Sequence, residues 1–152
     1  MVPVLLLFHT ATVNRSLAVT IPYRMSGSTL RRAPVGFTDV VSGTYYYYAV
    51  GWAQYYGVVN GVTTTSFAPT RGVTNEQILT MLHRYATEYC GRTYQTYKSF
   101  ATNLADYSSI MSYSRTAVNW ALNAGIVMPT SGSSTRRAMF LGRSAPSIFF
   151  DL

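Results

Sequence analysis

The sequence has few charged residues and almost no cysteine. Only 11% of its 152 residues are charged, against about a quarter in a typical globular chain, so Ser, Thr, Asn, Gly and Tyr must cover much of the surface. Cys90 is the only cysteine, which excludes an intrachain disulfide and a metal site built on cysteine pairs. His9 and His83 lie far apart without a ligand-spaced neighbour, so neither a metal nor another cofactor is expected.

Acidic side chains are scarcer still, with 5 against 12 basic ones and a net charge of +7. Eleven of the basic residues are arginine, whose planar fork suits carboxylate or phosphate, so an anionic partner is plausible. Arg31-Arg32 and Arg136-Arg137 are isolated pairs. Basic runs with interleaved aromatics, as on a nucleic-acid-binding face, are absent, so no nucleic-acid partner is expected.

Long apolar runs are also missing. Residues 1–8 are apolar, but they are too few to span a membrane, and they lack the basic start and cleavage site of a signal peptide. No other stretch predicts a transmembrane segment. Hydrophobic residues nevertheless make up 48% of the chain, enough to bury a core.

The sequence does contain an internal repeat. The pattern Ala-Val-x-Trp-Ala-x-x-x-Gly-x-Val occurs at residues 49–59 and again at 117–127, in a register of 68, with Tyr45 and Tyr113 upstream in the same register. Such self-similarity indicates a protein built from copies of one unit. Trp52 and Trp120 lie among Ala and Val, which favours a packing role over sugar stacking.

Helical spacing of apolar residues predicts helices over residues 45–56, 74–89 and 114–124. The second begins with a capping box, Thr74-x-x-Gln77. A fainter echo, in a register of 60, aligns residues 15–26 with 75–86 and predicts a helix over residues 8–27, kinked at Pro22. Thr135-Arg136 occupies the position in its unit that Thr74-Asn75 occupies in the preceding one, so a short helix is expected after it. The predicted fold class is therefore all-α, made of helix-loop-helix units with one unit incomplete.

Residues 37–86 resemble a known family. The residues that carry the likeness are Phe37-x-Asp39-Val40, Tyr45-Tyr46-x-x-Ala49-Val50-x-Trp52-Ala53-x-x-x-Gly57-x-x-x-Gly61, Phe67-x-Pro69, Val73-Thr74-Asn75-x-Gln77 and Leu82-x-Arg84-x-Ala86. The pattern is similar to an S-layer homology (SLH) repeat. By this resemblance, residues 1–34 are the second helix of a preceding repeat plus a linker, residues 35–92 a complete repeat, and residues 93–152 a linker and a divergent repeat.

The resemblance implies a non-catalytic module in a pseudo-threefold helical bundle. Modules of this kind attach proteins to the bacterial cell wall, at the cell surface, by binding an anionic and often pyruvylated secondary cell-wall polysaccharide between repeats. Their key element is a Thr-Arg dipeptide at the start of the second helix. An arginine beside a helix N-terminus offers a charged fork and free N–H groups to a carboxylate.

Carried over by position, the resemblance implies nine glycan-binding residues. Thr135-Arg136 keeps the dipeptide, Arg15 keeps the arginine after Asn14, and Asn75 stands in the arginine's place. The nine candidates are Arg15, Asp39, Tyr45, Gly61, Thr74, Asn75, Gln77, Thr135 and Arg136.

Other interpretations stay open. Asn75 and the divergent third repeat would also suit an SLH-like interaction or structural module that has lost glycan binding. A hydrolase is not expected, because glycoside hydrolysis needs two facing carboxylates and the five acidic residues show no such pairing. The incomplete first repeat suggests a truncated or frameshifted fragment, which another copy or another SLH-containing chain would complete.

Overall fold

The computed structural model describes residues 13–94, 107–130 and 134–140. The chain forms two compact units. The N-terminal unit contains residues 13–74 and 84–93, and the C-terminal unit contains residues 75–83 and the described residues from 94 onward. Phe8, the first residue of the earliest predicted helix, lies outside the described residues.

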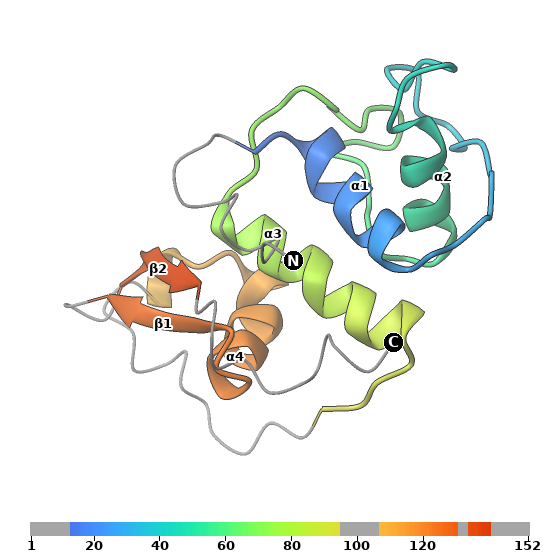
Figure 1. The fold of residues 1–152 in the computed structure, drawn as a ribbon. Helices are drawn as coiled ribbons and strands as arrows, with labels where there is room; N and C mark the ends of the chain where they lie inside the picture. Colours follow the sequence, from blue (N-terminus) through green and yellow to red (C-terminus); the bar gives the residue numbers. More distant parts are fainter. Residues whose placement is uncertain (1–12, 95–106, 131–133, 141–152) are drawn as a thin grey trace. The chain divides into compact units, whose positions relative to one another are not determined.

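Two helices form the frame of the N-terminal unit: α1 (Arg15–Met25) and α2 (Tyr47–Tyr55), which pack side by side (Figure 1). The Asn14 side chain caps α1 by accepting a hydrogen bond from the Leu17 N–H, 2.9 Å away, as short polar side chains do at helix starts. α1 continues through Pro22, which is buried. Both helices lie within the ranges that the sequence predicts.

The core of this unit is centred on Trp52, which is fully buried on α2. Its ring centroid lies 4.9 to 6.2 Å from those of four tyrosine rings: Tyr23, Tyr56, Tyr85 and Tyr89. Tyr23 belongs to α1, Tyr56 directly follows α2, and the other two belong to the π-helical turn η2 (Tyr85–Tyr89). These tilted and edge-to-face arrangements are the favoured ones for aromatic pairs. The prediction that the two tryptophans pack in the core is confirmed for both, since Trp120 is also buried.

The linker between α1 and α2 packs on α2 through its backbone. The Gln54 side-chain amide accepts from the Val35 N–H (2.7 Å) and donates to the Val35 carbonyl (2.8 Å). One turn earlier, the backbone of Arg32 and Ala33 lies directly against Gly51, where a Cβ atom would collide with it. The linker is therefore fixed to the helix by contacts that do not depend on its own side chains.

The C-terminal unit is also mainly helical, with a small hairpin. It contains most of α3 (Asn75–Arg84), the 3-10 turns η4 (Tyr107–Ser109) and η5 (Ser112–Ser114), α4 (Arg115–Asn123), and strands β1 (Val127–Thr130) and β2 (Ser134–Phe140). The strands pair antiparallel, Val127 opposite Phe140 and Thr130 opposite Ser134. The helix-rich described chain confirms the all-α class, apart from this hairpin. The threefold arrangement of repeats stays a prediction.

The helix expected after Thr135-Arg136 is wrong, because both residues belong to β2. Ala138 stands where a capping box needs Glu or Gln, so the helix start lacks its reciprocal hydrogen bond. Residues 131–134 read Ser-Gly-Ser-Ser, a composition typical of the turn in a short hairpin. Strand pairing then satisfies the backbone groups that a helix would have satisfied.

The two repeat registers are visible in the contacts of each unit. Trp52 packs against Tyr23 of α1 (5.5 Å), and Trp120 packs against His83 of α3 (5.3 Å). The register of 68 relates the two tryptophans, and the register of 60 relates Tyr23 to His83. Each unit therefore contains an equivalent aromatic contact between two helices, α1 with α2 and α3 with α4.

Helices α2 and α4 also end in the same way. Gly57 and Gly125 adopt positive φ angles of 71° and 66°, and the next residues, Val58 and Ile126, donate to carbonyls five positions back at 2.8 and 2.9 Å. This geometry is the Schellman motif, which favours glycine. Within the described residues, no helix is long and apolar enough to cross a membrane.

Replacing Gly51 with Ala tests the packing of the linker. Glycine to alanine inside a helix ordinarily stabilises by about 1 kcal/mol, but the added methyl group here meets the Arg32 backbone. We expect the free energy of unfolding in urea to fall by about 1–3 kcal/mol, the usual cost of overpacking. Thr116→Ala on exposed α4 surface is the control, and a stabilised Gly51→Ala protein would contradict the packing.

Candidate ligand-binding site

The loop after α2 is organised by one carboxylate. Asp39 accepts three hydrogen bonds: from the Phe67 N–H (2.8 Å), the Ala68 N–H (2.7 Å) and the Ser66 hydroxyl (2.7 Å). Burial raises the pKa of the Asp39 carboxyl, but these three donors more than offset it, so the pKa lies below its ordinary value. Asp39 is therefore charged at neutral pH and holds the turn at residues 66–68.

This turn contains a strained residue. Ala68 has a φ of 55°, in the left-handed region where a residue with a side chain costs roughly 1 kcal/mol or more. The hydrogen bond from its N–H to Asp39 offsets part of that cost. The turn also sends Phe67 inward, where its ring is fully buried beside Phe37, 5.7 Å between centroids.

Arg15 holds the same loop from the opposite side. Its Nε donates to the Phe67 carbonyl (2.6 Å), its Nη2 donates to the Asn60 carbonyl (2.8 Å), and its guanidinium lies 4.6 Å from the Phe67 ring centroid. Only 5% of Arg15 is exposed. The arginine at the dipeptide position of α1 thus stabilises the loop from the inside.

Gly61 lies where this loop turns most tightly. A Cβ atom there would collide with the Thr63 carbonyl oxygen and approach the Phe37 ring to 2.6 Å. The Val62 N–H then donates to the Ser66 carbonyl (2.8 Å) and closes the turn. Arg15, Asp39 and Gly61, chosen from the sequence as ligand contacts, therefore converge on one loop and shape it.

Tyr45 is placed differently, with its ring 59% exposed. Its hydroxyl hydrogen bonds with the Ser16 hydroxyl (2.7 Å) in the first turn of α1. The N–H of Arg15, the residue before Ser16, donates to the carbonyl of Arg71 (2.9 Å). Tyr45 and Arg71 are thus tied to consecutive residues at the start of α1, and we call this region the α1 junction (Arg15, Ser16, Tyr45 and Arg71).

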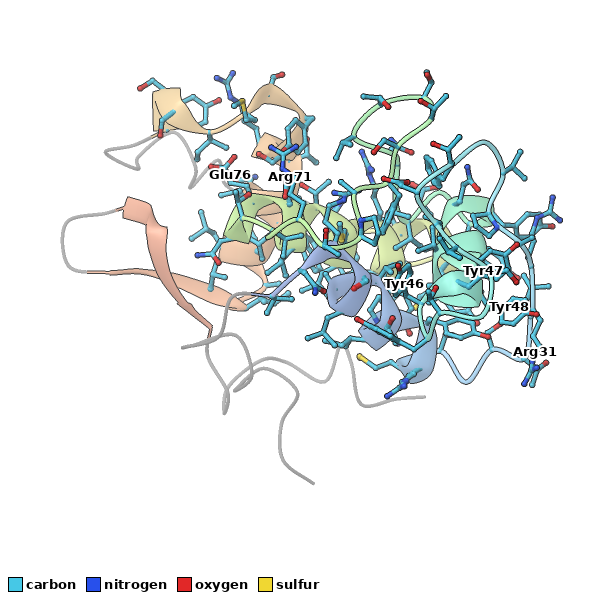
Figure 2. All side chains as sticks on the ribbon, turned by 90° about the horizontal axis from the view of Figure 1, so that it is seen from above. Arg31, Tyr46, Tyr47, Tyr48, Arg71 and Glu76 are labelled. Carbon is cyan, nitrogen blue, oxygen red and sulfur yellow. The ribbon has the colours of Figure 1, made fainter. Side chains whose placement is uncertain are left out.

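Arg71, whose backbone carbonyl lies at the start of α1, has an exposed side chain, which Figure 2 labels. Its guanidinium has no recorded hydrogen bond or ion pair with any other described residue. The sequence analysis missed Arg71 and Ser16. The available signal was the dipeptide Thr70-Arg71, a second Thr-Arg four positions before the expected one.

The equivalent junction of the C-terminal unit contains a carboxylate instead. Glu76, which the register of 60 relates to Ser16, accepts hydrogen bonds from the Met111 N–H and the Ser114 hydroxyl, both at 3.2 Å. Tyr113, the counterpart of Tyr45, is 52% exposed nearby in the sequence. The start of α3 therefore presents a negative group where the start of α1 presents a hydroxyl.

The remaining candidates belong to other segments of the chain. Thr74 is exposed at the end of the first segment of the N-terminal unit, and Asn75 and Gln77 are half-buried in the first turn of α3, in the other unit. Thr135 and Arg136 lie on β2. Their roles in ligand binding stay predictions.

The described residues contain no cluster of three or more His, Cys, Asp or Glu side chains that could hold a metal ion. The exposed groups of the α1 junction are an aromatic ring and a guanidinium, which can stack on a sugar ring and bind an anion. Together with the helix-rich fold, they describe a mainly helical module with an exposed aromatic and cationic site.

Residues 36–78 match the family model of the S-layer homology domain. The match covers the Asp39–Phe67 loop and α2 and ends in the first turns of α3, and it confirms the resemblance stated from the sequence. S-layer homology domains are in general non-catalytic modules of cell-wall and S-layer anchoring that bind wall polysaccharides at the cell surface. No curated protein matches the chain.

Asp39→Asn tests the loop clamp. The carboxylate accepts three hydrogen bonds, so we expect a loss of about 1–3 kcal/mol in the free energy of unfolding at neutral pH. Because the folded pKa is lowered, this contribution is complete above the unfolded value of about 3.9 and is lost as the pH falls through the folded pKa.

Urea unfolding of the wild type and Asp39→Asn between neutral and acid pH measures the effect. The difference between them should shrink as the pH falls below about 4. Glu88→Gln, at an exposed carboxylate, is the control for the loss of a single negative charge. A gap between wild type and Asp39→Asn that is independent of pH would contradict the assignment.

Proposed function

We propose that this chain is a non-catalytic cell-wall anchor that binds an anionic, pyruvylated secondary cell-wall polysaccharide at the α1 junction. The observation that carries the proposal is the exposed Tyr45 ring, tied by a 2.7 Å hydrogen bond to the first turn of α1. A ring fixed in this way can stack on a sugar with little loss of side-chain entropy.

Arg71 supplies the charge in this proposal. Its exposed guanidinium forms no hydrogen bond or ion pair within the described part of the chain and can form a bidentate pair with a ketal-linked carboxylate. Arg15, which is buried under the loop, acts as a positioning residue: it holds the Asn60 and Phe67 carbonyls and so fixes the loop that carries Arg71. Asp39 and Gly61 support the same loop from the other side.

The second candidate function is an interaction or structural module without glycan binding, and Glu76 favours it. Its carboxylate stands at the C-terminal junction and would repel an anionic sugar, and Asn75 adds no positive charge. Of the two junctions, only the α1 junction therefore binds glycan under the leading proposal. A second copy, or another SLH-containing chain, would supply the further junctions of a complete bundle.

Co-sedimentation with isolated wall polysaccharide tests the leading proposal. We expect the wild type to be retained by the pyruvylated polymer and released after mild acid removes the pyruvyl groups. Arg71→Gln should weaken binding about tenfold or more, since hydrogen bonds to charged groups contribute about 1.5–3 kcal/mol. Tyr45→Ala should also weaken it.

Tyr113→Ala is the matched control, because it removes an exposed tyrosine from the equivalent position of the other junction. Its binding should equal that of the wild type. Absence of retention for the wild type, unchanged when Asn75→Arg restores the arginine of the dipeptide, would overturn the anchor in favour of the interaction module.

A further inference from the structure

On α2, away from the loop that Asp39 holds, two arginines of the linker lie over two tyrosines. The Arg31 guanidinium is 5.6 Å from the centroid of the Tyr48 ring, and the Arg32 guanidinium is 4.6 Å from that of Tyr55. All four side chains are exposed, Tyr48 to 39% and Tyr55 to 56%. We call this surface the arginine–tyrosine ledge, and Figure 2 shows Arg31 and Tyr48 at the same edge of the molecule.

The ledge is held in place before any ligand arrives. Gln54 pairs with both backbone groups of Val35, and the Arg32 backbone lies against Gly51. The linker therefore presents both arginines from a fixed backbone. Fixing the backbone in advance lowers the ordering cost of binding.

The stacked arginines keep their hydrogen-bonding edges free. A guanidinium whose flat face makes a cation–π contact has its N–H donors in the plane of the group, available to another partner. No hydrogen bond or ion pair is recorded for either guanidinium with the other described residues. Each can therefore form a bidentate pair with an external anion.

The spacing of the tyrosines selects a polymer over a small anion. Tyr48 and Tyr55 are seven residues apart, which puts them on one side of α2, about 10 Å apart along its axis. A single carboxylate cannot reach both arginine–tyrosine pairs. A chain that carries anionic groups at intervals can engage both at once and gain from the linkage.

We propose that the arginine–tyrosine ledge binds a carboxylate-bearing glycan chain. The ledge is then a second contact for the class of ligand assigned to the α1 junction, and this choice of ligand rests on the proposed function. Single-stranded nucleic acid suits the ledge less well. It would stack its bases on tyrosine faces, and a guanidinium already covers one face of each ring.

Titration calorimetry with oligogalacturonate, a soluble polymer with regularly spaced carboxylates, tests the ledge. Arg31→Gln and Arg32→Gln should each weaken binding about tenfold, and Arg31→Lys with Arg32→Lys should recover only part of it, because lysine lacks the planar fork. Arg24→Gln removes an equal charge from another exposed position of the same unit and should leave the affinity unchanged. Full recovery with lysine would overturn the fork geometry.

Two further ligands separate charge and polymer class. Fully methyl-esterified oligogalacturonate, which keeps the sugars and loses the charges, should not bind. Oligo(dT) should bind more weakly than oligogalacturonate. Tighter binding of oligo(dT), lost in the Arg31→Gln/Arg32→Gln protein, would overturn the glycan proposal in favour of nucleic acid.

A variant with both Tyr45→Ala and Arg71→Gln separates this proposal from the anchor. The ledge proposal expects that variant to retain oligogalacturonate binding and the Arg31→Gln/Arg32→Gln variant to lose it. The opposite result would overturn the ledge and leave the α1 junction standing. If the variant with Tyr45→Ala and Arg71→Gln also keeps wild-type affinity for wall polysaccharide, the proposal for the α1 junction is wrong and the proposal for the ledge is retained.

Discussion

The backbone of Phe67 connects the parts of the N-terminal unit. Its N–H is held by the Asp39 carboxylate and its carbonyl by the Arg15 guanidinium, so one buried residue links the start of the repeat to α1. Both hydrogen bonds involve a charged partner, which makes them stronger than ordinary ones. The loop that carries Gly61 and Arg71 has its shape because both backbone polar groups of Phe67 are bound.

The sequence was sufficient to predict most of the helices, because these depend on local patterns. Apolar spacing gave α2, α3 and α4 to within a few residues at their ends, apart from the switch to a π-helical turn at Tyr85. The registers of 68 and 60 also predicted which residues are equivalent, and the pairs Tyr23–Trp52 and His83–Trp120 are the three-dimensional result.

The site was harder to predict, because side-chain partners far apart in the sequence determine it. A motif assigns Arg15 a position, but it cannot indicate that its guanidinium will donate hydrogen bonds to the Asn60 and Phe67 carbonyls, 45 and 52 residues away. Glu76 was overlooked because its partners, Met111 and Ser114, lie 35 and 38 residues away in the sequence. The error at Thr135 has the same origin, since the pairing of β2 with β1 overrides a weak local helix signal.

The hydrogen bonds between Gln54 and Val35 have a consequence for how this surface can evolve. Gln54 binds the main chain of the linker, which every residue other than proline offers in the same form. Substitutions at positions 31, 32 and 35 can therefore change the charge and chemistry of an exposed face while the attachment of the linker and the Trp52 core stay as they are. Single substitutions at these positions can therefore change which ligand the surface binds without lowering the stability of the unit.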